Sequence, residues 1–570
     1  MTPEELAVEF PLGPDSLPQP GVPQGRMEKF TWNTSRIFPG TTRDCWIYVP
    51  AQYDAAKPAC VFVVQDGEGH WTPERRWRIP TILDNLIHQR AIPLMIGIFI
   101  NPGKIPASVP DAAPRENRSF EYDALGDRYA RFLIEEILPE VGRRYNLAQD
   151  GNSRAIMGGS SGAMCAFNVA WERPDAFARV LSIVGSYTAM RNGHNMPALV
   201  RLTEPKPLRV FLESGANDFK IYAGDWYVAN QDLLSALRYS GYDVSHAWAQ
   251  HAGHDDYHGS SIFPGALRWL WQDYPTPVRA GKSSQPVMQV VRAGEAWQPV
   301  GGEYPSASAL AVNAAGDVFV ASAADECIYR IAGDGVPQVW AKRVAQVATM
   351  VFGPGGMLYA GQPGHRRVVK LNPQGKMETW LKHIDAAGIS FSPKGNAYVS
   401  EPEQQKLWLV TPDGERQAQS FNAEGELALQ KPGAGPVAMD APWAVQVFGG
   451  GGQLLVSDAH GVAAWVFTIR ADGTLADAAP FFRPVVLDGE TTPGVTALAL
   501  SSTGWPAFAT TAGVQLGMKR GGLITGLIRS PSPERLEAIA FGGAGFNQLY
   551  VSDGRRLYRR QIQVPDELWG

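Results

Sequence analysis

The sequence is poor in cysteine and has no long apolar run. Only four cysteines, Cys45, Cys60, Cys165 and Cys327, occur in 570 residues, and no two are spaced as C-x-x-C. The absence of C-x-x-C pairs excludes the usual zinc and thiol–disulfide motifs. We expect buried free thiols, with a Cys45–Cys60 bridge as the open alternative. No run of about twenty apolar residues is present, so we expect no membrane-spanning helix.

The chain also lacks strong charge of either sign and an N-terminal targeting pattern. Its formal net charge is −5, which gives no electrostatic reason to expect nucleic acid or an anionic membrane as a partner. The first residues, Met1 to Leu6, carry neither the basic nor the apolar region of a signal peptide. The compartment therefore stays open: cytoplasmic, or periplasmic or secreted if a signal peptide has been removed.

What is present is the composition of a soluble globular protein of more than one domain. Hydrophobic residues make up 45% of the chain and charged residues 19%, both ordinary values. A length of 570 residues is too great for one hydrophobic core. The oligomeric state cannot be predicted from these numbers.

The most informative stretch is Gly158-Gly159-Ser160-Ser161-Gly162. An apolar run at 154–157 predicts a buried strand before it, and residues 163–171 predict a helix after it. G-x-S-x-G between a strand and a helix is the pattern of a nucleophile elbow. The turn is so tight that glycine is needed beside the serine. This frame makes Ser160 the nucleophile; Ser161 remains the alternative, with Ala163 in place of the last glycine.

Around this stretch, strands alternate with helices from residue 43 to residue 273. Alternation of this kind predicts a mostly parallel sheet with helices on both faces. The predicted strands are 43–49, 59–65, 94–100, 154–157, 179–185, 208–213 and 246–250, and the predicted helices are 80–88, 127–145, 163–171, 225–239 and 262–273.

A serine nucleophile needs a base that is held by a carboxylate. In this type of fold the acid follows the serine in the chain and the histidine comes last. Asp218 stands in a loop after the strand 208–213 and is the best-placed acid, with Asp225 and Glu213 as alternatives. His254 follows a glycine after the next strand and is the predicted base.

Two alternatives stay open in the histidine-rich segment 251–259. His258 could replace His254 as the base, although a place at the rim of the pocket fits it better. The spacing of His254 and His258 also permits a metal site, with Asp255 or Asp256 as a further ligand. Because a serine and an acid already account for one histidine, we predict no metal and no cofactor.

Ester chemistry also requires donors for the oxyanion. One should be the backbone N–H of Ser161, and the second should come from the loop after an early strand, at Gly67 or Glu68. Three aromatic residues are candidates to line the substrate site together with His258, although ordinary core positions explain them better: Trp71, Tyr122 and Trp226.

The second half of the chain repeats one pattern, a pair of strands joined by a glycine-containing turn. It occurs at 310–322, 351–360, 389–400, 445–457, 498–510 and 539–552. A period of this length is typical of propeller blades. Six copies predict a six-bladed β-propeller; an irregular β-sandwich would not repeat the same turn six times.

Five motifs of the first half resemble the enterochelin esterase and feruloyl/acetyl xylan esterase group, which are esterase D-like α/β-hydrolases. They are Gln65-Asp66-Gly67, the stretch from Asn117 to Asp123, Gly158 to Gly162, Ser214 to Asp218 and Gly253-His254-Asp255. The resemblance covers about residues 10–275. It implies carboxylic ester hydrolysis with Ser160 as nucleophile, Asp218 as acid and His254 as base, on an acyl group carried by a sugar, polysaccharide or siderophore.

The second half is similar to the gluconolactonase/regucalcin family, whose members bind a divalent metal in the central funnel. Here the pattern departs from that family. Pro442-Trp443-Ala444-Val445 and Gly494-Val495-Thr496-Ala497 stand where metal ligands are expected, and the first-blade glutamate of that family has no clear counterpart near Pro305-Ser306-Ala307. Three missing oxygen ligands leave little to hold a hard cation.

We therefore expect an extended lead-in (1–27), an esterase domain (28–275), a linker (276–290) and a propeller (291–570). The predicted function is a metal-independent serine esterase acting on a small-molecule or polysaccharide ester, with the propeller supporting or positioning the substrate. The rivals are a metal-dependent lactonase in the propeller and a glycan-binding protein that has kept a hydrolase shape.

Overall fold

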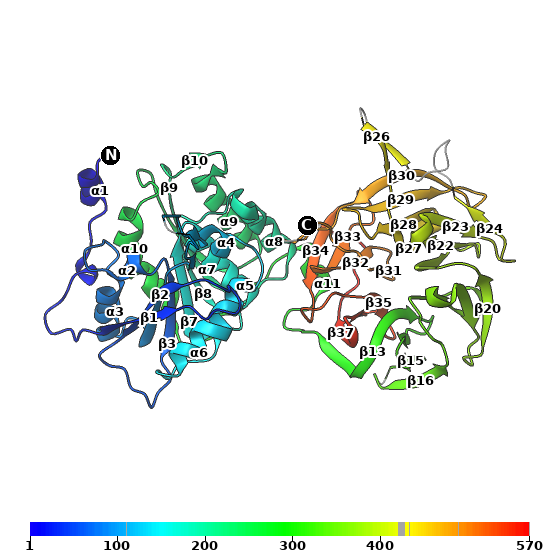
Figure 1. Ribbon diagram of the computed structural model, residues 1–570, viewed down its shortest axis with the longest axis horizontal. Coiled ribbons are helices and arrows are strands. Elements are labelled where there is room, and N and C mark those ends of the chain that lie inside the picture. The colour runs from blue at the N-terminus through cyan, green and yellow to red at the C-terminus, as the bar shows by residue number, and fades with distance from the viewer. Residues whose placement is uncertain (110, 334, 420–427, 432–433, 488–489, 569–570) are drawn as a thin grey trace. The chain divides into compact units, whose positions relative to one another are not determined.

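A computed structural model of the chain describes all residues except 110, 334, 420–427, 432–433, 488–489 and 569–570 (Figure 1). The chain forms two compact units. The first comprises residues 1–201 and 205–283, and the second comprises residues 202–204 and 284–570.

The first unit is built on one mixed sheet whose strands lie in the order β1-β2-β4-β3-β7-β8-β9-β12. The first two pairings, β1 with β2 and β2 with β4, are antiparallel, and all the others are parallel. The bounds are β1 (Arg26–Trp32), β2 (Arg43–Val49), β3 (Cys60–Gln65), β4 (Met95–Ile100), β7 (Arg154–Gly159), β8 (Arg179–Ile183), β9 (Arg209–Gly215) and β12 (Asp243–Ala249). Two short hairpins, β5 (Lys104–Ile105) with β6 (Arg115–Glu116) and β10 (Lys220–Ile221) with β11 (Gly224–Asp225), lie outside this sheet.

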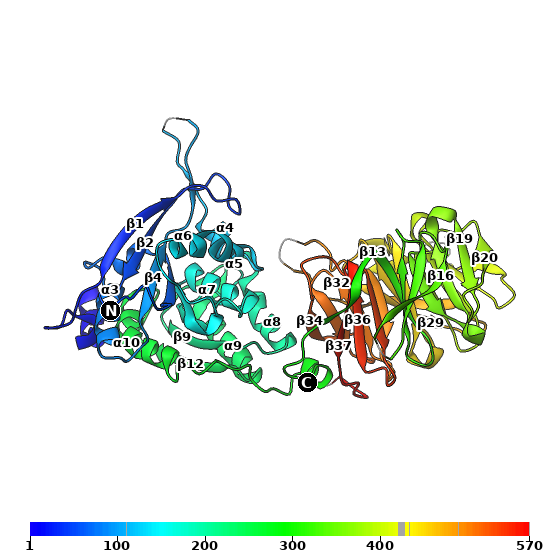
Figure 2. The ribbon, with the colours of Figure 1, turned by 90° about the horizontal axis from the view of Figure 1, so that it is seen from below.

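Helices flank the sheet on two sides, as Figure 2 shows. In that view α3 and α10 lie on one side of the sheet, and α5, α6 and α7 lie on the other. The helices are α1 (Pro3–Glu9), α2 (Glu68–Trp71), α3 (Ile79–His88), α4 (Arg118–Tyr122), α5 (Arg128–Arg131), α6 (Leu138–Gly142), α7 (Ser161–Glu172), α8 (Met196–Leu202), α9 (Trp226–Tyr239) and α10 (Tyr257–Trp271). Within the described residues, none of the helices is both long and apolar enough to span a membrane.

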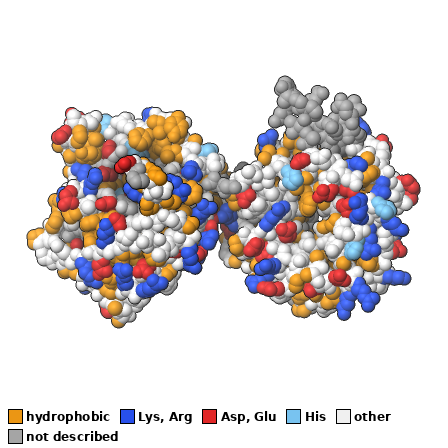
Figure 3. All heavy atoms as spheres, in the orientation of Figure 1, with side chains coloured by type: hydrophobic (Ala, Val, Ile, Leu, Met, Phe, Trp, Pro, Cys, Tyr) orange, Lys and Arg blue, Asp and Glu red, His pale blue; other side chains and the backbone are white. Residues whose placement is uncertain are grey.

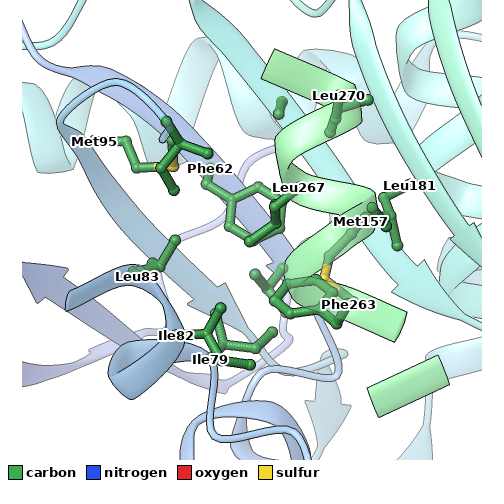
Figure 4. Close-up of a cluster of buried hydrophobic side chains, with 14 of the residues drawn as sticks. Phe62, Ile79, Ile82, Leu83, Met95, Met157, Leu181, Phe263, Leu267 and Leu270 are labelled. Atoms are coloured by element: carbon green, nitrogen blue, oxygen red, sulfur yellow. The ribbon is translucent and has the colours of Figure 1, made fainter. Parts of the chain in front are cut away.

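The central strands are apolar along their whole length because both of their faces are covered. Every residue of β3, β4 and β9 is buried, as expected for parallel strands between two helical layers. On one face, Phe62 and Met157 of the sheet pack against Phe263 and Leu267 of α10 (Figure 4). Residues of α3 complete this cluster.

Three predicted elements differ in detail from the structure. The lead-in is not wholly extended: residues Pro3–Glu9 form α1, which a capping box at Thr2 begins, and β1 already starts at Arg26. The predicted helix 127–145 is divided into α5, a π-helical turn at Phe132–Ile137 and α6. The helix predicted from 262 starts at Tyr257, five positions earlier, because the histidine segment continues directly into it.

The second unit consists of antiparallel sheets. All six predicted strand pairs are antiparallel pairs in the structure. The bounds are β13 (Gln298–Val312), β14 (Val318–Ser322), β15 (Cys327–Ile331), β16 (Pro337–Lys342), β17 (Thr349–Phe352), β18 (Leu358–Gln362), β19 (Arg367–Leu371), β20 (Met377–Lys382), β21 (Gly388–Phe391), β22 (Ala397–Glu401), β23 (Lys406–Val410), β24 (Arg416–Ala418), β25 (Ala428–Lys431), β26 (Ala434–Ala438), β27 (Pro442–Phe448), β28 (Gln453–Asp458), β29 (Ala464–Ile469), β30 (Leu475–Phe482), β31 (Ala497–Leu500), β32 (Pro506–Thr510), β33 (Gly513–Gly517), β34 (Ile524–Arg529), β35 (Ala538–Gly542), β36 (Gln548–Ser552) and β37 (Gly554–Gln561).

The first strand of each pair faces a common centre. Strands β13, β17, β21, β27, β31 and β35 contact one another in this order, and β35 in turn contacts β13. The long strand β13 joins the two ends of the unit, because its first part pairs with β37 and its last part with β14. The second unit is therefore propeller-like.

Part of the predicted linker belongs to the core of the second unit. The short helix α11 (Pro286–Val290) buries Val287 and Val290 against a cluster that contains Trp505 and Ile528. The boundary between the units lies between residues 283 and 284, inside the predicted linker 276–290. The sequence signal for this packing was the presence of apolar residues, Val287 and Val290, at the end of the Pro- and Ser-rich stretch that was predicted as a linker.

The packing of α10 on the sheet predicts how two substitutions in this helix differ. Leu267→Ala removes a fully buried side chain and should lower the free energy of unfolding of the first unit by about 2–5 kcal/mol. Gly265→Ala adds a methyl group where no atom lies within 4 Å, and should raise it by about 0.5–1 kcal/mol. Hydrogen exchange of peptides from β3 and β7, measured in the full chain, would separate the two. Equal protection in both variants would contradict this packing.

Candidate active site

The turn between β7 and α7 holds Ser160 in a conformation that is rare for a residue with a side chain. Its φ is 58° and its ψ is −122°, outside the regions that L-residues normally occupy. Two backbone hydrogen bonds fix it: the N–H of Ser160 donates to Ile183 O at 2.9 Å, and its carbonyl accepts from the N–H of Ser186 at 3.2 Å. Such a conformation persists only where the surroundings impose it, and it is typical of active sites.

Other atoms lie close to the two outer glycines of the motif, and at Gly158 they leave no room for a side chain. A Cβ on Gly158 would lie 2.3 Å from the carbonyl carbon and oxygen of Gly162. A Cβ on Gly162 would lie 3.0 Å from Asp66 Oδ2 and 3.2 Å from Gln65 Cβ. Ser160 is partly exposed at the turn, whereas Ser161 is buried as the first residue of α7. This favours the frame with Ser160 as nucleophile.

The structure brings His254 and Asp218 together. His254 Nδ1 lies 2.6 Å from Asp218 Oδ1, and the side chains are 16% and 0% exposed. The same carboxylate oxygen accepts the N–H of Phe219 at 2.7 Å. The loop that carries Asp218 is held close to the histidine segment at Gly215, where a Cβ would lie 2.1 Å from Ala252 O.

Aromatic rings fix the plane of the His254 imidazole. Phe219 stacks on it, with ring centroids 4.0 Å apart and an interplanar angle of 17°. Trp226 meets it edge-on at 6.2 Å. Trp226, one of the predicted substrate contacts, is buried. It lies beside His254 and is not part of an open surface. The sequence motifs did not single out Phe219, although its position next to Asp218 was the available signal.

The hydroxyl of Ser160 has a partner that the sequence did not reveal. In the described part of the chain its hydrogen-bond partner is Ser186, with the two Oγ atoms 3.1 Å apart. Ser186 is fully buried in the loop after β8, and it also accepts the indole N–H of Trp226 at 3.1 Å. A serine after a parallel strand, at the same edge as Ser160, was the available signal.

The predicted oxyanion donors are placed differently from one another. The N–H of Ser161 stands in the first turn of α7, where no intrahelical acceptor exists. The N–H of Gly67 donates to Ile100 O at 3.1 Å, and that of Glu68 donates to Asn101 Oδ1 at 3.1 Å. Neither of these two N–H groups is free in this arrangement, so their predicted role requires the loop to shift and stays a prediction.

An arginine–carboxylate pair lies against the same turn. Arg118 donates to both oxygens of Asp66 at 2.8 Å and to Gly159 O at 3.3 Å. The guanidinium thus connects the loop after β3 to the elbow. Both residues belong to the quoted family motifs, but the motifs alone predict no role for either.

The alternative base of the segment, His258, has a carboxylate of its own. His258 Nδ1 lies 2.7 Å from Glu213 Oε1, and both side chains are buried. Burial raises the pKa of Glu213, and the hydrogen bond with His258 opposes that rise. His258 also packs against the ring of Phe10. The two histidines that could have shared a metal therefore point to different acids, and His258 is buried, not at a rim.

The remaining predicted residues take structural positions. Tyr122 is fully buried; its hydroxyl accepts the N–H of Asp66 at 3.3 Å. Trp71 packs against Trp46 at the margin of the core cluster. Asp225 caps α9, where its side chain accepts the N–H of Val228. Contact of Tyr122 or Trp71 with a substrate stays a prediction.

A cavity of about 420 Å³ runs between the inner strands of the second unit. Its lining includes one residue in or directly before each inner strand: Ser308, Thr349, Gly388, Ala444, Thr496 and Glu537. Of these six, only Glu537 has a charged side chain, which is a poor donor set for a hard cation. Across the described residues, no group of three or more His, Cys, Asp or Glu side chains could hold a metal ion.

Comparisons with known proteins find one family match and several distant relatives. Residues 38–254 match the model of a family described as "Putative esterase". An iron(III) enterobactin esterase of Escherichia coli is 26% identical over 240 residues, which are 40% of this chain and 54% of the relative. The chain thus spans about half the length of that relative.

Two solved structures are similar to parts of this chain at low sequence identity. The enterobactin esterase of Shigella flexneri is 21% identical, with a TM-score of 0.36, over 46% of this chain and 63% of its own. A gluconolactonase of Xanthomonas campestris is 14% identical, with a TM-score of 0.40, over 48% of this chain and 92% of its own.

The close approach of Gly158 to Gly162 predicts the effect of adding one methyl group. Gly158→Ala should displace the start of α7 and abolish ester hydrolysis, because the new Cβ would overlap backbone that cannot rotate away. Gly69→Ala is the matched control, since a Cβ there meets nothing within 4 Å. Hydrolysis of a simple aryl ester measures both. Full activity in Gly158→Ala would be incompatible with this turn.

Proposed function

We propose that the chain is a serine carboxylic ester hydrolase in which Ser160 is the nucleophile, His254 the general base and Asp218 the acid that orients it. The observation that carries the proposal is the 2.6 Å hydrogen bond between His254 and a buried Asp218, at the same edge of the sheet as the strained turn of Ser160. The esterase family match over residues 38–254 supports the same reaction.

In acylation, His254 Nε2 takes the proton of Ser160 while Oγ attacks the ester carbonyl. Asp218 accepts the Nδ1 proton, which selects the tautomer with a free Nε2 and stabilises the imidazolium. The N–H of Ser161 supports the oxyanion. His254 then protonates the leaving alcohol, and the acyl group stays on Ser160.

Deacylation repeats the sequence with water in place of Ser160. His254 removes a proton from the water, the hydroxide attacks the acyl carbonyl, and Ser160 leaves with the proton returned by His254. No metal or cofactor takes part in the proposed reaction, which agrees with the separate pairing of His254 and His258.

For the second unit we propose a six-bladed propeller that supports or positions the substrate. The ring of six inner strands and the strand β13 shared between its two ends support this assignment. Glu537 is the only charged residue among the described residues that line the cavity, and a single carboxylate argues against the rival interpretation as a metal-dependent lactonase.

The nucleophile assignment predicts opposite results for two adjacent serines. Ser160→Ala should lower kcat/KM on acetyl and feruloyl esters by at least about 10³-fold. Ser161→Ala should stay within a few-fold of wild type, because it keeps the backbone N–H. EDTA should change neither result. Activity that survives Ser160→Ala but not EDTA would refute the proposal and favour a metal site.

For the substrate we propose an ester with an aromatic acyl group, of the feruloyl type, on a carbohydrate or related alcohol. An apolar hairpin beside His254 supports this choice: Phe219 stacks on the imidazole and is 47% exposed, and Tyr222 at the tip is 96% exposed. Figure 3 shows hydrophobic side chains gathered over the hairpin β10–β11. A flat apolar acyl group gains by covering such a surface, whereas an acetyl group is too small to reach it.

The hairpin predicts a change in selectivity. Tyr222→Ala should raise KM for feruloyl esters by about 3- to 10-fold, from the loss of part of one aromatic contact, and leave acetyl esters unchanged. Tyr239→Ala, a second exposed tyrosine of this unit, is the matched control. Unchanged feruloyl-to-acetyl selectivity in Tyr222→Ala would remove the support for an aromatic acyl group.

A further inference from the structure

Ser186 is a buried hydroxyl in contact with the proposed nucleophile. Its Oγ lies 3.1 Å from Ser160 Oγ and 3.1 Å from the indole nitrogen of Trp226. It is fully buried, so bulk water does not compete for these bonds. The triad described above does not use it.

The loop that carries Ser186 contains a residue with a strained backbone conformation. Val184 has a φ of 42°, a true outlier for a β-branched residue. Its N–H donates to Glu213 O at 2.8 Å, and the Asn230 side chain donates to Gly185 O at 2.9 Å. The N–H of Ser186 itself donates to the Ser160 carbonyl. Strain that the surroundings impose on this loop points to a function for the residues it positions.

The neighbours of Ser186 determine the direction of its hydrogen bond. An indole N–H can only donate, so the Ser186 oxygen accepts from Trp226. In the proposed reaction the proton of Ser160 goes to His254, and Ser160 Oγ then has only lone pairs to offer Ser186. Ser186 is therefore the donor in the reactive state.

We propose that Ser186 is a further catalytic residue, whose hydroxyl donates a hydrogen bond to Ser160 Oγ. The inference rests on the proposed function of Ser160. As His254 takes the proton, negative charge develops on Oγ, and a hydrogen bond to a charged acceptor is stronger than one to a neutral hydroxyl. The Ser186 proton stays on Ser186 throughout. In deacylation the C–O bond to Ser160 breaks, and the same donor stabilises the departing oxygen.

The test compares Ser186→Ala with Ser182→Ala in the full chain. Ser182 is a matched control: it is equally buried, lies in the preceding strand β8, and bonds to Tyr187 instead of Ser160. We expect Ser186→Ala to lower both kcat/KM and the rate of phosphonylation of Ser160 by a fluorophosphonate by about 10- to 100-fold, the range for hydrogen bonds to charged groups. Ser182→Ala should remain within about 3-fold of wild type.

The pH profile separates a chemical role from a structural one. Loss of a donor lowers the plateau of kcat/KM in Ser186→Ala and leaves its midpoint unchanged, whereas displacement of His254 from Asp218 shifts the midpoint. Equal rates in Ser186→Ala and Ser182→Ala, or a shifted midpoint, would overturn the inference. Ser160→Ala in the same assay tests the proposed function independently: if it keeps activity, the proposed function itself fails.

Discussion

The first unit depends on one close approach, the passage of the backbone at Gly158 within reach of Gly162. A Cβ on Gly158 would lie 2.3 Å from backbone atoms of Gly162. Because glycine has no Cβ, the chain can turn there from strand to helix without an intervening loop. That turn forces Ser160 to a φ of 58° and places the N–H of the next residue in the first turn of α7. The proposed nucleophile and one proposed oxyanion donor are thus set by the same constraint.

The parallel sheet supplies the rest of the site because its strands end at one edge. Ser160 follows β7, Ser186 follows β8, Asp218 follows β9 and His254 follows β12. These four strands are neighbours in the sheet, so residues that are up to 94 positions apart in the sequence meet at its carboxyl edge. This is where ligands bind in α/β sheets. Two buried carboxylates, Asp218 and Glu213, bind His254 and His258 separately.

The sequence predicts well those structural features that depend on strong local patterns. Apolar runs such as Met95–Ile100 and the glycines around Ser160 have one physical explanation, and the structure agrees with them. The contact between His254 and Asp218 could be anticipated because chain order and strand ends restrict the choice. The six strand pairs of the second half could be found because each repeats the same turn.

The features that the sequence could not predict depend on contacts between distant residues. The N–H groups of Gly67 and Glu68 look available in the sequence, but they donate to Ile100 and Asn101 of the next strand and its loop. His258 looks like a rim residue until its pairing with Glu213 is seen. The start of α1 and the burial of Val287 depend on a local cap and on tertiary packing inside stretches whose composition is that of a linker. Ser186 is one serine among many until its distance to Ser160 is known.

The most direct test of the proposed mechanism is to locate the covalent intermediate. The full chain would be treated with a fluorophosphonate, digested, and mapped by mass spectrometry. We predict one adduct per chain, on the peptide that contains Ser160, with hydrolysis lost in proportion to labelling. An adduct on another residue, or continued hydrolysis by fully labelled protein, would contradict the mechanism.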